Sequence, residues 1–267
     1  MINWQNRRNS KMTPTEFRHT VRDNRFKKTT AGICPGFAQA NLIVLPQADA
    51  YDFLLLAQRN PKPIPILEVT EIGNRKLQKL GLDTDIATDF PKYRIYKDGQ
   101  LVDEYLSVAD YWRDDLVGFL IGCSFSFEDL IIDAGIEIRH ITEDVNVPMF
   151  NTNIPLTPAG KFSGNMVVSM RPIKSSQITA AINVTNRVPD VHGAPIQIGN
   201  AEEIGILDIT KPDFGDAVTI KDDEIPVFWA CGVTPQAAVM ASKPSFAITH
   251  SPGHMLVTDL SNKDLIV

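Results

Sequence analysis

The segment at residues 227–235 places the strongest restriction on the fold of this chain. Residues 227–233 form an apolar run of strand length, and Thr234 and Pro235 follow it without a break. Threonine is a favoured helix N-cap, and proline suits the first helical turn. The segment therefore predicts a buried strand that leads directly into a helix. Residues 122–128 repeat the arrangement, with a glycine bend before a second helix start.

Capping signals and turn residues predict further elements along the chain. Thr13 and Glu16 can form a capping box that opens a helix reaching about Lys28. Asp98 and Gly99 supply the tight turn of a hairpin. The other predictions are strands at 40–45, 66–72, 136–141, 165–170, 217–220 and 246–249, and helices at 48–59, 107–121, 128–134 and 175–186.

Strands alternate with helices at both ends of the chain, around a middle that is richer in strands. This order predicts a mixed α/β and α+β fold with two domains. We expect one three-layer α/β/α-like domain that is discontinuous and combines residues 1–135 with 225–267. A smaller two-layer α+β domain is expected at residues 136–224.

Composition and charge exclude several classes of protein. With 43% hydrophobic and 22% charged residues, the chain is ordinary for a globular protein, which argues against disorder, collagen and coiled coil. Its 26 basic and 32 acidic side chains give a net charge of -6, so no nucleic-acid partner is expected. No run of about 18 apolar residues occurs, so no membrane partner is expected either.

The compartment is inferred from the amino terminus and the cysteines. Residues 1–13 carry basic side chains but no apolar segment behind them, so they lack the pattern of a secretory signal. Cys34, Cys123 and Cys231 are odd in number and far apart, which fits reduced thiols. We therefore expect a cytoplasmic protein, and the sequence leaves open whether it forms a homo-oligomer.

The most informative candidate site is the segment 122–128. A helix start after a glycine bend leaves backbone N–H groups and the hydroxyls of Ser124 and Ser126 near one point, which suits an anion. The helix start at Thr234 could supply a second set of donors at the end of a strand, and two such starts could clamp a dicarboxylate. The alternative is structural: Ser126 caps the helix and its phenylalanine neighbours anchor the bend.

Titratable side chains offer further candidates. Cys231, at the end of an apolar strand, is either a small buried hydrophobe or a nucleophile whose pKa the helix start lowers. His250 and His254 are four residues apart, but Pro252 and Gly253 between them prevent the helix that would bring both to one metal. No metal is therefore expected. A loop histidine that transfers a proton and one that only packs are equally plausible.

Two more residues could contact a substrate. Arg171 follows an apolar strand and precedes proline, where its planar fork could hold a carboxylate or pair with a surface acid. His192 precedes Gly193 in a turn-rich loop that is typical of close approach to another group. The chain has no glycine-rich phosphate loop of the usual spacing, so no cofactor is expected.

Several short motifs occur in one order along nearly the whole chain, from about residue 16 to residue 260. They are the segments 31–36, 39–42, 112–116, 122–128, 169–172, 192–195, 227–236 and 248–255. Together they resemble the hydro-lyase family that is similar to D-glutamate cyclase. The resemblance implies an intracellular two-domain fold of mixed α and β structure. For the relative with an assigned activity it implies closure of D-glutamate to 5-oxo-D-proline with loss of water.

The resemblance leads to a functional prediction: a cofactor-independent lyase or cyclase that removes water from a small acidic amino or hydroxy acid. The catalytic candidates are His254, Glu128 and Cys231, and the substrate-binding candidates are Ser124, Ser126, Arg171, His192, Thr234 and His250. One alternative is a non-catalytic carboxylate-binding or regulatory protein with the same anion site. Another is a metal-assisted hydrolase that uses two histidines and a cysteine.

Overall fold

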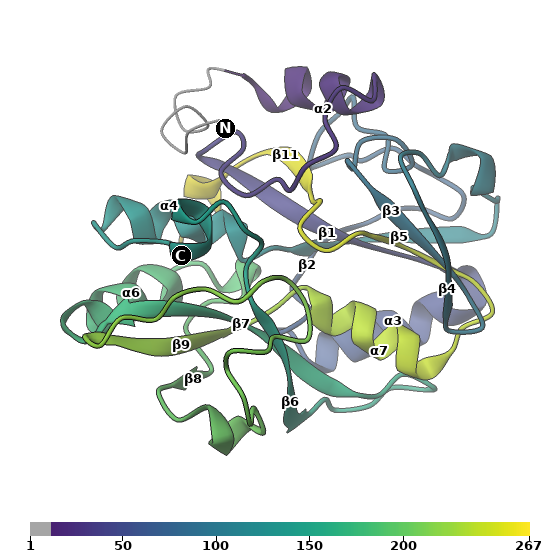
Figure 1. Cartoon of the computed structure of the whole chain (residues 1–267). Coiled ribbons are helices and arrows are strands. Elements are labelled where there is room, and N and C mark those ends of the chain that lie inside the picture. Colours follow the sequence, from purple (N-terminus) through teal and green to yellow (C-terminus); the bar gives the residue numbers. More distant parts are fainter. Residues whose placement is uncertain (1–11) are drawn as a thin grey trace.

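Two antiparallel sheets organise the chain, and the computed structural model describes residues 12–267 of it (Figure 1). The larger sheet has the order β2 (Ile66–Val69), β5 (Leu116–Gly122), β1 (Phe37–Pro46), β10 (Ala247–His250), β3 (Tyr93–Lys97) and β4 (Gln100–Tyr105), and β11 (Leu256–Ser261) also pairs with β1. The smaller sheet has the order β6 (Met149–Pro155), β7 (Asn165–Lys174), β9 (Glu224–Ala230) and β8 (Gln197–Ile198).

Helices lie between the sheets and beside them. They are α2 (Pro14–Arg22), α3 (Gln47–Arg59), α4 (Phe125–Asp133), α5 (Arg139–Thr142), α6 (Ile178–Asn186) and α7 (Val233–Ser242). This combination confirms the mixed α/β and α+β fold class that the order of elements predicts.

Strand β1 is buried on both faces, and its alternate residues enter two different cores. Ile43 and Leu45 pack with Phe53 of α3, Ala238 of α7 and Phe228 of the smaller sheet. The neighbouring β1 residues pack instead with apolar side chains from the loop before β3. Helices α3 and α7 therefore fill the space between the two sheets, as Figure 1 shows.

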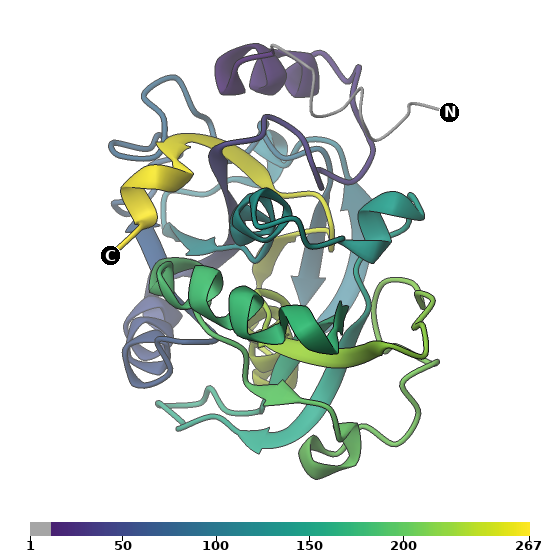
Figure 2. The same ribbon diagram turned by 90° about the vertical axis from the view of Figure 1, so that its left-hand side faces the viewer.

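The far face of the smaller sheet is covered by α4 and α6, which lie side by side in the view of Figure 2. Phe127 and Ile131 of α4 and Ala181 of α6 pack against Trp229 of β9. Helix α4 thus connects the end of the larger sheet to the outer face of the smaller one.

Local signals predict some elements well. Thr13 and Glu16 form the expected capping box, although α2 ends at Arg22, earlier than predicted. Strands β3 and β4 form the expected hairpin, and Asp98 and Gly99 have φ angles of 50° and 76°, as a tight hairpin turn requires.

Three predicted elements are wrong. Residues 107–121 do not form a helix: a single 3₁₀ turn at Ala109–Tyr111 precedes β5, which is buried between β1 and β2. An apolar run cannot by itself distinguish a central strand from a buried helix. Residues 136–141 contain the start of the short α5 in place of a strand, and residues 217–220 form no strand.

The predicted division into two domains follows the sheets only in part. Strand β9, which the sequence assigns to the first domain, pairs with β7 and β8 in the smaller sheet. The division itself stays a prediction. The proposed lack of a secretory signal concerns residues 1–13, most of which lie outside the described residues.

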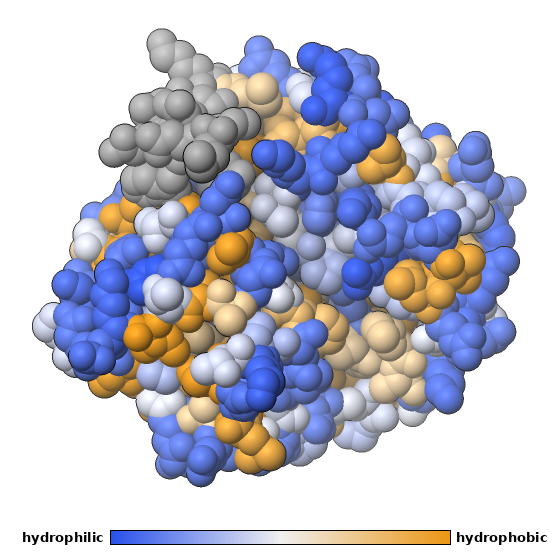
Figure 3. Space-filling model, in the orientation of Figure 1, coloured by the Kyte–Doolittle hydropathy of each residue, from blue (hydrophilic) through white to orange (hydrophobic). Residues whose placement is uncertain are grey.

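In the described part of the chain, no helix has both the length and the hydropathy that a membrane crossing needs. On the face shown in Figure 3, hydrophilic residues cover much of the surface and the hydrophobic ones form separate patches. The described residues of this face therefore form no continuous apolar strip.

Candidate functional site

Two strand-to-helix junctions meet near the middle of the molecule. Strand β5 ends at Gly122 and α4 begins at Phe125, while β9 ends at Ala230 and α7 begins at Val233. In Figure 1, α4 lies to the left of this point and α7 to the right. Both helices therefore have their N-termini, with partial positive charge, in the same region of the fold.

Both junctions line one small cavity, which we name the inner cavity. Its volume is about 20 Å³, enough for roughly one water molecule. Its wall consists of Asn41, Cys123, Ser124, Phe125, Asn146, Val147, Met149, Cys231, Gly232, Val233, His250, Gly253 and Met255. The structure thus brings together the predicted site residues Ser124, Cys231 and His250.

Among the described residues, none that lines the inner cavity carries an ionised side chain at neutral pH. Burial raises the pKa of the Cys231 thiol to about 11 and raises that of Cys123 as well. Burial also lowers the pKa of His250 to about 3. The amide N–H of Leu42 donates to His250 Nδ1 at 3.1 Å, so the proton of the neutral ring is on Nε2. An uncharged wall with hydrogen-bond donors suits an anion.

Gly232 allows the two walls of the inner cavity to approach each other. A Cβ atom at this position would lie 2.1 Å from Nδ2 of Asn41. Asn41 is fixed because its Nδ2 donates to the carbonyl oxygens of Gly122 at 2.8 Å and of Ile121 at 3.3 Å. Asn41 is therefore bonded to the end of β5 and lies close against Gly232, just before α7.

A buried ion pair lies behind Ser124. Arg171 donates from Nη2 to the Ser124 hydroxyl at 3.2 Å, from Nη1 to Ser169 at 2.9 Å, and from Nε to Glu128 at 3.0 Å. Nη2 also pairs with Glu128, whose Oε1 lies 3.2 Å from Nε2 of His140. Burial raises the pKa of Glu128, but His140 and Arg171 lower it by more, so the group is a carboxylate.

Arg171 and Glu128 are not in the wall of the inner cavity. The Arg171 side chain is fully buried, and its guanidinium stacks over the rings of Phe127 at 5.0 Å and Trp229 at 5.6 Å. With its nitrogens bonded to Glu128, Ser124 and Ser169, it holds the start of α4 in place.

The hydroxyls of Ser126 and Thr234 attach the two helix starts to the sheets. Ser126 accepts from the amide of Gln39 at 2.9 Å and donates to its carbonyl oxygen at 3.3 Å. Thr234 makes the same pair of contacts with Val167, at 3.0 and 3.1 Å. Neither residue belongs to the wall of the inner cavity.

A second, larger cavity of about 460 Å³ lies beside the loop at residues 251–254, and we name it the outer cavity. It is lined by Lys92, Arg94, Glu104, Asn146, Asp213, Phe214, Gly215, Ser251, Pro252 and His254. Asn146 belongs to the walls of both cavities. The predicted residue His254 therefore lies next to the inner cavity but not in its wall.

His254 is neutral and has one defined donor. Its Nδ1 lies 2.9 Å from the carbonyl oxygen of Pro252, which can only accept, so Nδ1 carries the proton and Nε2 is the basic nitrogen. Burial lowers the pKa of His254, and Lys92 lowers it further, against the raising effect of the Pro252 carbonyl. The ring is thus unprotonated at neutral pH.

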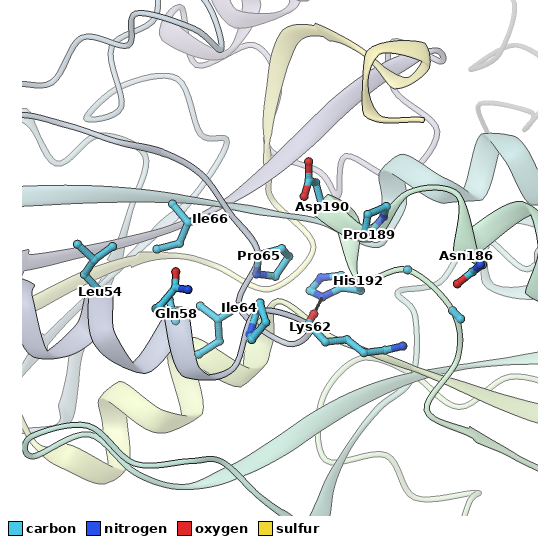
Figure 4. A pocket seen from close by; sticks show the side chains of 14 residues that line it. Leu54, Gln58, Lys62, Ile64, Pro65, Ile66, Asn186, Pro189, Asp190 and His192 are labelled. Atoms are coloured by element: carbon cyan, nitrogen blue, oxygen red, sulfur yellow. Dashed lines mark hydrogen bonds between the residues drawn. The ribbon is translucent and has the colours of Figure 1, made fainter. Parts of the chain in front are cut away.

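His192 lies in a third cavity of about 570 Å³ beside the end of α3, as Figure 4 shows. Its Nδ1 contacts the carbonyl oxygen of Lys62 at 3.0 Å, and burial lowers its pKa to about 4. The structure does not bring His192 together with Ser124, Cys231 and His250.

The histidines and cysteines do not form a metal centre. Within residues 12–267, no group of three or more His, Cys, Asp or Glu side chains is arranged to hold a metal ion. His250 and His254 belong to the walls of different cavities.

Comparison with known proteins places the chain in a family. The family model described as D-glutamate cyclase matches residues 117–259, which include every residue of the inner cavity wall except Asn41. The chain belongs to the D-glutamate cyclase family.

Close relatives of this family cover nearly the whole chain. A protein of Clostridium beijerinckii named "Putative hydro-lyase" is 59% identical over 96% of this chain and 98% of its own length. Hydro-lyases named in the same way from Bordetella pertussis and Bacillus subtilis are 60% and 56% identical. They cover 88% and 96% of this chain and 85% and 100% of their own lengths.

The sequence does not indicate several residues that line the two cavities. Asn41 lies inside a buried strand, and the sequence alone shows it only as a polar residue among apolar neighbours. Lys92, Arg94 and Glu104 have the composition of an exposed hairpin. Only the pairing of β3 with β10 brings them beside the loop that carries His254 in this member of the D-glutamate cyclase family.

Proposed function

We propose that this protein removes water from a small acidic amino acid and closes a D-glutamate-type substrate to a 5-oxo-D-proline-type lactam. One observation carries the proposal: the starts of α4 and α7 line the same inner cavity, and the lining residues within 12–267 are all uncharged. Membership of the D-glutamate cyclase family supports the same reaction.

The reaction sets clear demands on the site. The amine nitrogen attacks the carbon of the distal carboxylate, a C–N bond forms and a C–O bond breaks. The ammonium group loses two protons, and the departing oxygen takes up two protons and leaves as water. The site must therefore neutralise a carboxylate as it is attacked, and it must move protons from nitrogen to oxygen.

The inner cavity meets the first demand. A carboxylate oxygen there would lie beside the helix N-termini of α4 and α7, the Ser124 side chain and the neutral ring of His250. Donors fixed in advance stabilise developing negative charge, and loss of one costs about 10²–10³ in turnover. The rest of the substrate would occupy the outer cavity, since the inner one is too small for it.

His254 meets the second demand. Its unprotonated Nε2 can take a proton from the substrate ammonium and return it toward the departing oxygen. Glu128 acts at a distance, as a positioning residue that fixes Ser124 through Arg171. Cys231 stays a thiol, so it contributes to the wall of the inner cavity without acting as a nucleophile.

The test is incubation of the full chain with D-glutamate and, separately, with L-glutamate, followed by mass detection of the lactam, which is lighter by one water. We expect product from one of the two acids. A raised melting temperature without product would instead support the non-catalytic carboxylate-binding protein. If neither product nor binding is detected, both functions are contradicted.

A further inference from the structure

The outer cavity contains a charged cluster that has no role in the reaction steps described above. Glu104 of β4 accepts a hydrogen bond from Arg94 Nε at 2.8 Å and from the Ser251 hydroxyl at 3.1 Å, and Lys92 Nζ lies 3.2 Å from it. These contacts join the β3–β4 hairpin to the loop that carries His254. The hairpin is thereby held against the wall of the outer cavity.

Arg94 keeps donors available for a ligand. Its Nε is bonded to Glu104, but Nη1 and Nη2 have no hydrogen-bond partner among residues 12–267. The side chain is 28% exposed, and that of Lys92 is 33% exposed, so both are reachable from the cavity. Two adjacent guanidinium N–H groups match the two oxygens of a carboxylate.

The position of Arg94 relates it to the inner cavity. Arg94 lines the outer cavity, and Asn146 lines both this cavity and the inner one. A molecule that occupies both cavities would therefore meet Arg94 at its outer end. The wall of the outer cavity also carries Asp213, whose carboxylate can accept from an ammonium group.

Arg171 cannot serve the same purpose. Its side chain is fully buried and its nitrogens are bonded to Glu128, Ser124 and Ser169. Of the two arginines, only Arg94 lines a cavity of amino-acid size.

We propose that Arg94, assisted by Lys92, binds the carboxylate that does not react and so selects short amino dicarboxylic acids. This inference rests on the proposed function only in assigning the other carboxylate to the inner cavity. Glu104 is a positioning residue, which orients Arg94 through its Nε.

The test compares D-glutamate with D-isoglutamine, in which the α-carboxylate is an amide, on the full chain. Calorimetric affinity and steady-state rates are measured for wild type, Arg94→Gln and Lys92→Met. The matched control is Arg113→Gln, because Arg113 is a half-exposed arginine that is paired with Asp115 and lines neither cavity. Melting curves show that each variant is folded.

We expect Arg94→Gln to weaken binding of D-glutamate and raise its KM by about 10- to 100-fold, with a smaller change in kcat. The preference for D-glutamate over D-isoglutamine should disappear in this variant, and Lys92→Met should give a smaller change in the same direction. Arg113→Gln should match wild type.

The outcomes separate the two proposals. If Arg94→Gln keeps the wild-type affinity and KM for D-glutamate and the same preference over D-isoglutamine, the role of Arg94 is overturned. Turnover of D-glutamate by wild type would in that case still support the proposed function. Binding that depends on Arg94 without any product would support the subsite and contradict the reaction. If Arg94→Gln does not fold, Lys92→Met becomes the test. An unchanged preference of Lys92→Met for D-glutamate over D-isoglutamine would then overturn the proposed carboxylate site.

Discussion

The Arg171 guanidinium donates to the Ser124 hydroxyl at 3.2 Å while it is paired with the buried carboxylate of Glu128. The first residue of the helix start is thus held by a charge pair inside the core. Because both charges are buried, loss of one partner would leave the other uncompensated. Stability and the geometry of the candidate site are therefore linked at this point.

Replacement of Arg171 by methionine should lower the free energy of unfolding by about 3–5 kcal/mol, since Glu128 would keep only His140 near its charge. Urea unfolding measures the effect. Arg113→Met is the matched control, because its ion pair with Asp115 is half-exposed and contributes little. Equal stability of the two variants would contradict the role given to the buried pair.

Gly232→Ala should close the inner cavity. The added methyl group would meet Asn41 Nδ2 at 2.1 Å and force the amide or the start of α7 to move. We expect loss of carboxylate binding together with a lower melting temperature. The double variant Gly232→Ala with Asn41→Ala should regain melting temperature, because the clashing amide is gone. If Gly232→Ala alone binds carboxylate and melts like wild type, Gly232 and Asn41 do not lie in close contact.

His254 should give the rate a defined pH dependence. A base must be unprotonated, and burial, followed by Lys92, lowers the pKa of His254 below its ordinary 6.5. The value of kcat/KM should therefore rise with pH through a pKa below 6.5 and be level at neutral pH. His254→Gln should abolish this rise of kcat/KM with pH and most of the turnover. A rate that falls as the pH rises through the same range would assign His254 the role of an acid.

Two buried histidines should make the folded state sensitive to acid. Burial lowers the pKa of His250 to about 3 and of His192 to about 4, whereas both rings titrate near 6.5 when unfolded. Below pH 6.5 the unfolded state binds more protons, so the free energy of unfolding falls as the pH falls. Each ring contributes up to about 1.4 kcal/mol per pH unit.

Urea unfolding at neutral pH and at about pH 5 measures this slope. His192→Asn should reduce the loss of stability on acidification, because one of the two rings that must be protonated is absent. An identical slope in wild type and the variant would show that His192 is already protonated in the folded protein.

The sequence predicts local features of the fold better than long-range pairing. The capping box at Thr13 and the Asp98–Gly99 turn depend on a few neighbouring residues, and both are present. The helix predicted over residues 107–121 is wrong for residues 116–121 because their apolar run is set by burial between β1 and β2, which no local pattern reveals.

The candidate site shows the same limit. The two strand-to-helix junctions that contain Ser124 and Cys231 are visible in the sequence, and both residues belong to the inner cavity wall. The sequence offers Arg171 for a substrate carboxylate or a surface acid, yet two of its partners, Glu128 and Ser124, are buried residues 43 and 47 positions away in the chain. The outer cavity depends on the antiparallel register of Arg94 with Thr249, which the sequence does not specify.

The role of the helix start of α4 is tested most directly by the rate of lactam formation in wild type, Ser124→Ala and Ser242→Ala. Ser242 is the control because its hydroxyl donates to Ala238 at the opposite end of α7, away from the inner cavity. We predict a loss of about 100-fold or more in Ser124→Ala, assayed well below its melting temperature, with Ser242→Ala close to wild type. Turnover by Ser124→Ala at the wild-type rate would contradict the anion-binding role of the inner cavity.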